Sequence, residues 1–162
     1  MSGIWITPVD DGFEVMLDHD ERDLLRMLPG QMRQVLAHGG DQVRRLFPPA
    51  YQSDALKQAE YDELMHDELT ARHMDALDVL EKTADAQLVS ADDLNGWIRA
   101  LNSVRILLGT RLGIDADEDD GQELAADHPQ IAEWAIYYFL TALQGDVVEA
   151  LTGSLAPPWN DD

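Results

Sequence analysis

The stretch Arg99–Ile114, RALNSVRILLGTRLGI, has the pattern of the last turns of an apolar helix that carries an arginine within its apolar face. Arg105 is that arginine. Because a buried, unpaired guanidinium is costly, a carboxylate or a set of carbonyl oxygens must meet it. At about 100° per residue, residues 91–112 surround it with apolar side chains on one side of the helix, namely Leu94, Trp97, Ile98, Leu101, Leu108 and Leu112.

Two interpretations of Arg105 follow. In the first, which we favour, Arg105 is structural, either in a buried ion pair or as an edge residue whose charged head reaches water. In the second, it anchors a ligand in a polar pocket together with His66 and His73. The candidate ion-pair partners are carboxylates of the preceding helical region, namely Asp62, Asp67 and Glu68.

The same helical region has a pattern that resembles a metal site. Asp62, His66 and His73 share one stripe, and Glu63 precedes His66 in the Glu-x-x-His spacing that di-iron helical bundles use twice. Here the motif occurs once, and the two histidines would lie about 10 Å apart at ~1.5 Å of rise per residue. That separation is too large for one ion, so we expect no metal site and no cofactor.

Capping signals mark the ends of two helices. The first helix opens at Asp18, with Glu21 in capping-box spacing, and at Pro29 it either kinks or gives way to a second helix. The helix over 91–112 is capped by Ser90 with Asp93, again three residues apart, and ended by Gly113.

Two longer apolar patterns complete the helical part. Residues 53–83 form one helical region, and because its apolar face drifts, we expect a break or a kink between about residues 61 and 66. The final helix begins near Pro129 and is apolar almost all round. One of its stripes exceeds what one small core covers, which favours a central position in the domain or a homodimer interface; this stripe comprises Ile136, Leu140, Leu143, Val147 and Leu151.

The N-terminal region has the pattern of a β-hairpin. Apolar stretches at Ile4–Ile6 and Phe13–Leu17 flank the turn residues Asp11 and Gly12. Such a hairpin is marginal alone, so it must lean on a helix or gain a third short strand at 87–89. We therefore predict a mainly α fold, a compact helical bundle of about five helices around a central C-terminal helix, with a small N-terminal β-hairpin.

Charge and composition exclude several classes of protein. Among 162 residues, 32 acidic side chains outweigh 11 basic ones, and the net charge of −21 argues against direct nucleic-acid binding. The chain has no cysteine, so it lacks disulfides and thiol chemistry. It shows neither a signal peptide nor an apolar run near the ~20 residues of a membrane span. We expect a cytoplasmic protein, with residues 1–155 as a single domain and residues 156–162 as a flexible tail.

Positive charge is concentrated near the N-terminus. Arg22, Arg26 and Arg33 share the outer face of the first helix, and Arg44 and Arg45 follow. They form either a basic patch for a partner or ion pairs within the chain, and we favour ion pairing. The sequence has no nucleophile elbow, P-loop, HExxH or dinucleotide motif, so we expect no enzymatic activity.

Four segments resemble one actinobacterial family, which is described as a domain of unknown function and includes AosR-like oxidative-stress-responsive transcriptional regulators. The resemblance extends from Trp5 to about Leu151 and implies a regulatory role. The redox sensing attributed to such regulators needs a pair of cysteines, so it is not implied for any residue here. The segments are RRLFPPAYQSDA (44–55), MHDELTARHMDALDVL (65–80), GWIRALNSVRILLGTRLGI (96–114) and AIYYFLTALQGDVVEAL (135–151).

These observations predict a non-enzymatic regulatory or protein-interaction module, linked to transcription control under stress and lacking a cysteine switch. Its expected partner is a protein, contacted through the acidic surface or the basic cluster. The alternative is a small-molecule-binding or enzymatic protein that uses a polar pocket around Arg105.

Overall fold

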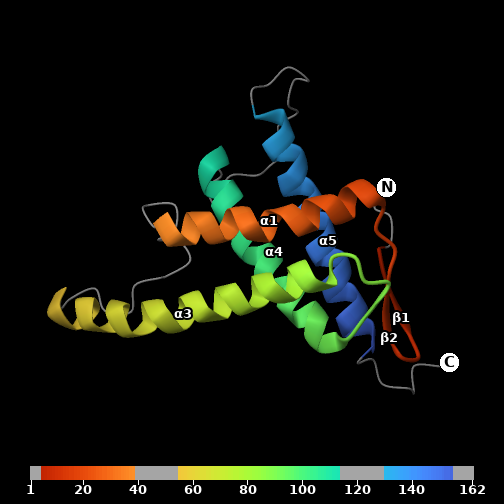
Figure 1. Ribbon diagram of the computed structural model, residues 1–162, viewed down its shortest axis with the longest axis horizontal. Coiled ribbons are helices and arrows are strands. Elements are labelled where there is room, and N and C mark those ends of the chain that lie inside the picture. The colour runs from red at the N-terminus through yellow and green to blue at the C-terminus, as the bar shows by residue number, and fades with distance from the viewer. Residues whose placement is uncertain (1–4, 39–54, 114–129, 155–162) are drawn as a thin grey trace.

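The computed structural model describes residues 5–38, 55–113 and 130–154, and for residues 55–67 it describes the backbone alone. Helices make up most of this part of the chain, and a small antiparallel sheet lies at one end of them (Figure 1). The predicted mainly α fold with an N-terminal hairpin is therefore confirmed. The elements are β1 (Ile6–Val9), β2 (Gly12–Val15), α1 (His19–His38), α3 (Ala55–Thr83), β3 (Leu88–Val89), α4 (Ala91–Leu112) and α5 (Ile131–Ser154).

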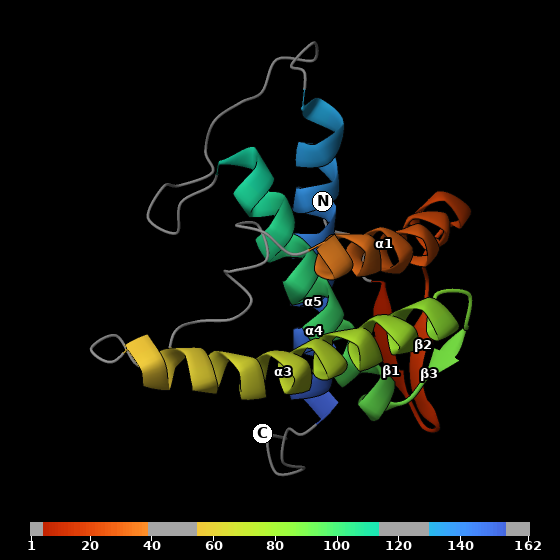
Figure 2. The same cartoon turned by 60° about the vertical axis from the view of Figure 1, so that its left-hand side comes forward.

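The helices form two layers that cross steeply (Figures 1 and 2). α1 and α3 run antiparallel in one layer, and α4 and α5 run antiparallel in the other. α4 contacts α5 and α3 most extensively and also touches α1. The helix that joins the layers is thus α4, whereas the sequence pattern favours the C-terminal helix α5 for the central position.

Small side chains allow α4 to approach α3 closely. A Cβ atom on Gly96 would lie 2.9 Å from Cγ1 and 3.1 Å from Cβ of Val79 on α3. The neighbouring Trp97 is fully buried, and its Nε1–H donates to Thr83 Oγ1 (2.7 Å). That hydroxyl in turn donates to Val79 O (2.6 Å). The indole therefore fills the space between the helices with its one polar group satisfied.

The strand order of the sheet is β1-β2-β3, which confirms the third strand expected near residues 87–89. Gly12, at the predicted turn, has φ 146°, and a Cβ atom there would lie 2.6 Å from Val89 O. A larger residue would push β3 away from β2. The face of the sheet turned toward the helices is buried and comprises Ile6, Phe13, Val15 and Val89.

One carboxylate of α5 holds the start of β1. Asp146 Oδ2 accepts hydrogen bonds from the backbone N–H groups of Trp5 (2.7 Å) and Ile6 (2.9 Å). The Trp5 ring also packs edge-on against Phe139 of α5, with ring centroids 5.6 Å apart. The hairpin therefore leans on α5 as well as gaining the third strand.

Both predicted capping boxes are present. Asp18 and Glu21 exchange reciprocal side-chain-to-backbone hydrogen bonds of 2.8 and 2.9 Å before α1. Ser90 and Asp93 do the same before α4 at 3.0 and 3.1 Å. Gly113, with φ 72°, ends α4 in the left-handed conformation that glycine adopts without strain.

Neither of the two possible helix breaks considered from the sequence occurs. α1 continues through the buried Pro29, so no second helix begins there. α3 is one continuous helix, so no break occurs between residues 61 and 66. The first half of α3 projects beyond the other helices (Figures 1 and 2). Its apolar residues therefore need not lie on the same side of the helix as those of the second half, which packs against α1 and α4.

One of the two apolar stripes of α5 lies inside the described core. Leu140, Leu143 and Val147 are 0% exposed, whereas Ile131 and Tyr138 on the other stripe are 37% and 39% exposed. The stripe that motivates the homodimer prediction is therefore covered within one chain. A homodimer stays a prediction.

Gly96→Ala tests the close approach of α3 and α4. We expect it to lower the free energy of unfolding by about 1–3 kcal/mol, because the stiff, branched Val79 must move. Gly145 on α5 is the matched control, since nothing lies within 4 Å of an added Cβ there. Gly145→Ala should raise stability by roughly 0.5–1 kcal/mol. Equal stabilities of the two variants in urea unfolding would contradict the packing described.

Candidate functional site

Arg105 points toward α5. Its Nε–H donates to Thr141 Oγ1 (3.0 Å), and its Nη1 group donates to Gln144 Oε1. The guanidinium carbon also lies 5.6 Å from the centroid of the Tyr137 ring. A hydroxyl, an amide oxygen and an aromatic face therefore meet this half-buried cation, and they join α4 to α5.

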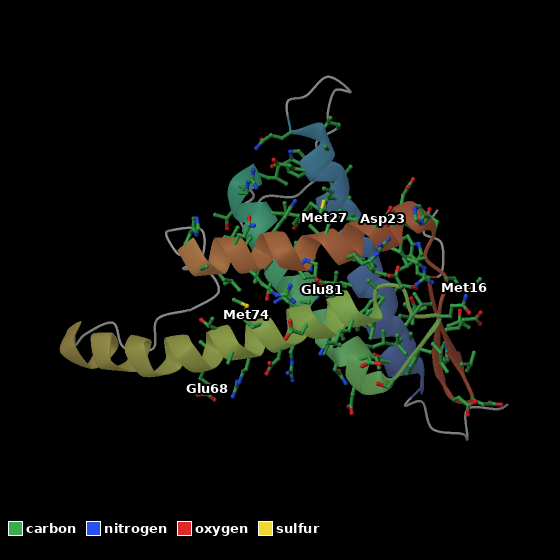
Figure 3. All side chains as sticks on the ribbon, viewed as in Figure 1. Met16, Asp23, Met27, Glu68, Met74 and Glu81 are labelled. Atoms are coloured by element: carbon green, nitrogen blue, oxygen red, sulfur yellow. The ribbon has the colours of Figure 1, made fainter. Side chains whose placement is uncertain are left out.

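The carboxylates considered as partners of Arg105 lie on α3. Glu68 points away from α1 (Figure 3) and is paired with Arg72, with 2.8 Å between Oε1 and Nη2. The side chains of Asp62, His66 and Asp67 lie outside the described part of the structure. Every contact of Arg105 with the described residues is thus with a neutral group of α5.

His73 lies between α3 and α4. Its Nδ1 atom is 2.8 Å from Ser103 Oγ, and that hydroxyl donates to Arg99 O at 3.0 Å. Because serine has a single hydroxyl hydrogen, the proton between the ring and Ser103 belongs to Nδ1 of His73. Ser103 and Arg105 are two positions apart, about 200° around the helix, so the structure does not bring His73 and Arg105 into one site.

A pocket of about 310 Å³ lies between α3 and α4 beside this hydrogen bond. We call it the α3–α4 pocket. Its floor is polar, because Ser103 is only 2% exposed and is bonded to His73. Three residues of each helix line it, namely Leu69, Arg72, His73, Arg99, Asn102 and Ser103.

Besides His73, four polar residues line the pocket, and no sequence motif identifies them as parts of a site. Their spacing does hold a signal, since residues 69, 72 and 73 and residues 99, 102 and 103 each share one helical face. That spacing is also common on solvated faces. It indicates a site only once α3 and α4 are known to lie against each other.

Arg22 of the predicted basic cluster turns inward. Its guanidinium donates four hydrogen bonds to backbone carbonyls of two segments, the β2–α1 connection and the α3–β3 connection. The accepting atoms, at 2.9 to 3.1 Å, are the carbonyl oxygens of Val15, Leu17, Ala84 and Ala86.

Arg26 and Arg33 make ion pairs between α1 and the end of α3. Arg26 pairs with Asp23 of α1, labelled in Figure 3, and through Nε with Asp85 at 3.2 Å. Arg33 contacts Asp78 at 2.5 Å and Glu81 at 2.6 Å. Partial burial acts to lower the pKa of Arg33, but the hydrogen bonds and charges of these carboxylates raise it above its ordinary value, so the guanidinium stays charged. The other two arginines of the cluster, Arg44 and Arg45, lie outside the described residues.

Among the side chains that the structure describes, which leave out those of residues 55–67, no three His, Cys, Asp or Glu residues come together as ligands for a metal ion. None of the described helices is both long and apolar enough to cross a bilayer.

The profile of a family described as domain of unknown function DUF2017 matches residues 3–151. The chain belongs to the DUF2017 family. This confirms the family that the four sequence segments resemble. No solved structure matches the chain.

Proteins named oxidative stress regulator AosR, from Mycobacterium bovis and from two strains of Mycobacterium tuberculosis, are similar to this DUF2017 chain. Each is 29% identical to it over 133 residues, which cover 72% of this chain and 60% of the relative. The chain therefore matches about three fifths of the length of these relatives.

Arg105→Met tests the link between α4 and α5 in this DUF2017 protein. We expect a loss of about 0.5–1.5 kcal/mol in the free energy of unfolding, because Thr141 and Gln144 lose a charged donor but can partly rehydrate. Arg111→Met is the matched control, since the 3.2 Å pair of Arg111 with Glu133 is partly exposed to water (51% and 31%) and should contribute less. An unchanged melting temperature for Arg105→Met would contradict a structural role for Arg105.

Proposed function

We propose that this DUF2017 protein is a regulatory protein that acts by contact with a protein partner and not by catalysis. The proposal extends to transcription control under stress, in the cytoplasm. It is supported by the relatives named oxidative stress regulator and by the family resemblance. Because the chain has no cysteine, its residues would respond to a partner or ligand and not through a thiol switch.

The observation that carries the proposal is the distribution of charge. Within the described residues, most arginines bind oxygens of the same chain, as Arg22 and Arg33 do. Many carboxylates face solvent without a counter-charge, so the surface would attract a basic protein and repel nucleic acid. Exposed carboxylates with no ion pair among the described residues include Asp10, Asp11, Glu14, Asp75 and Asp92.

A tagged form of the full chain tests the proposal by recovery of partners from native lysate. We expect one defined basic protein or polymerase-associated protein, retained at low salt and released at high salt because surface charges are screened. An unrelated protein of similar net charge serves as control bait. Repeated recovery of nothing beyond that control would contradict the proposal.

Two charge-neutralised variants sharpen the test. One replaces Asp10, Asp11 and Glu14 on the hairpin by their amides, and the other replaces Asp75, Asp92 and Glu149 on the helices. Each variant removes the same amount of negative charge. If the partner docks on one face, the variant that is changed on that face should recover several-fold less partner than the other variant. Equal small losses would indicate attraction by net charge alone and would contradict a specific contact.

A further inference from the structure

We propose that the α3–α4 pocket binds a small organic or inorganic anion, with a phosphate or carboxylate group held by Arg72 and Arg99. The site goes beyond the proposed regulatory function and does not depend on it. It is built from described residues only, three from each of two helices that lie against each other.

Arg99 is the observation that points to a ligand. Six of the seven arginines whose side chains are described donate to oxygens of this chain, in ion pairs or in hydrogen bonds. The Arg99 guanidinium has no hydrogen bond or ion pair to any described residue, although the chain holds 32 acidic side chains. A fork of donors without an acceptor, at the wall of a pocket, is suited to bind an oxyanion at two points.

The other lining groups complete a donor set for an anion. Arg72 reaches the pocket from the opposite helix, and its pair with Glu68 is exposed on both sides (62% and 52%). Such a surface pair is weak, so an incoming anion could share this guanidinium. Asn102 adds an amide donor, one residue before Ser103.

The floor of the pocket is held in place before any ligand arrives. Ser103 donates to Arg99 O, and Nδ1–H of His73 donates to Ser103. These two bonds fix the His73 ring and the turn of α4 that carries Arg99. Arg72 and Arg99 therefore line one pocket whose floor is already formed, which lowers the entropic cost of binding.

Size and charge favour a small molecule over an acidic peptide. A volume of about 310 Å³ is at the lower end of ligand pockets, which suits a single anionic group with a short body. An acidic peptide would extend over neighbouring surface of a chain whose net charge is −21 and would be repelled there. A small anion would contact Arg72 and Arg99, with Glu68 as the carboxylate that it must displace or share Arg72 with.

The test is titration of the purified full chain with inorganic phosphate, with succinate and with a hexaglutamate peptide, at constant ionic strength. Binding is followed by isothermal titration calorimetry and by backbone amide NMR shifts. We expect saturable binding of phosphate, succinate or both, with shifts confined to residues 69–73 and 99–103. Which of the two probes binds more tightly distinguishes a phosphate from a carboxylate ligand.

Three variants assign the binding to the guanidinium. Arg99→Ala should weaken the Kd at least tenfold, and Arg99→Lys should also weaken it, because an ammonium keeps the charge but lacks the fork. Arg111→Ala is the control, since it removes the same charge from the same helix outside the pocket and should change the Kd less than twofold.

The outcomes that overturn the site are distinct from failure of the regulatory proposal, since no protein partner takes part. Absence of saturable binding by phosphate and succinate overturns it, as does binding of hexaglutamate alone. Shifts spread over the whole surface, or equal weakening by Arg99→Ala and Arg111→Ala, would indicate general charge screening and would also overturn it. The NMR map of the unmodified chain decides the matter even if a variant fails to fold.

Discussion

The four hydrogen bonds from Arg22 to backbone carbonyls are the interaction on which the rest of the structure depends. Val15 O and Leu17 O lie where the chain leaves β2 for α1, and Ala84 O and Ala86 O lie where it leaves α3 for β3. Carbonyls past a helix C-terminus lack helical partners and favour a cation. A sheet of three short strands is marginal alone, so this guanidinium holds it against both helices of one layer.

The contacts that the arginines make within the chain determine the charge of its surface. Arg22, Arg26 and Arg33 tie α1 to the end of α3, and Arg105 ties α4 to α5. Because these few cations bind oxygens of the chain, the exposed surface is left with carboxylates, which is the basis of the proposed contact with a basic protein. Arg99 is the exception among the described arginines, and this contrast distinguishes the α3–α4 pocket from the rest of the surface.

Features encoded by neighbouring residues could be predicted from the sequence. The capping boxes at Asp18–Glu21 and Ser90–Asp93 and the glycine that ends α4 depend on spacings of three residues or on a single backbone conformation. The third strand follows from the need of a small hairpin for a further partner. The family also follows from local segments.

Features that depend on which helices meet could not be predicted. The periodicity places Arg105 on an apolar face but does not say whether α3 or α5 supplies its oxygens, and α5 does. It places Arg22 on the outer face of a helix, whereas a long side chain can reach back to carbonyls of another segment. The α3–α4 pocket could not be predicted for the same reason, since its two rows of lining residues form a site only where α3 and α4 pack together. The central position of α4 follows from Gly96, whose missing side chain matters only beside Val79.

Urea unfolding of Arg22→Met beside Arg26→Met tests the central claim most directly. The two residues are one turn apart on α1 and differ in what they bind, four backbone carbonyls against exposed carboxylates. We expect the free energy of unfolding to fall by about 2–4 kcal/mol in Arg22→Met, or that protein to fail to fold. In Arg26→Met the loss should be less than about 1 kcal/mol. Equal, small losses in the two proteins would contradict this expectation.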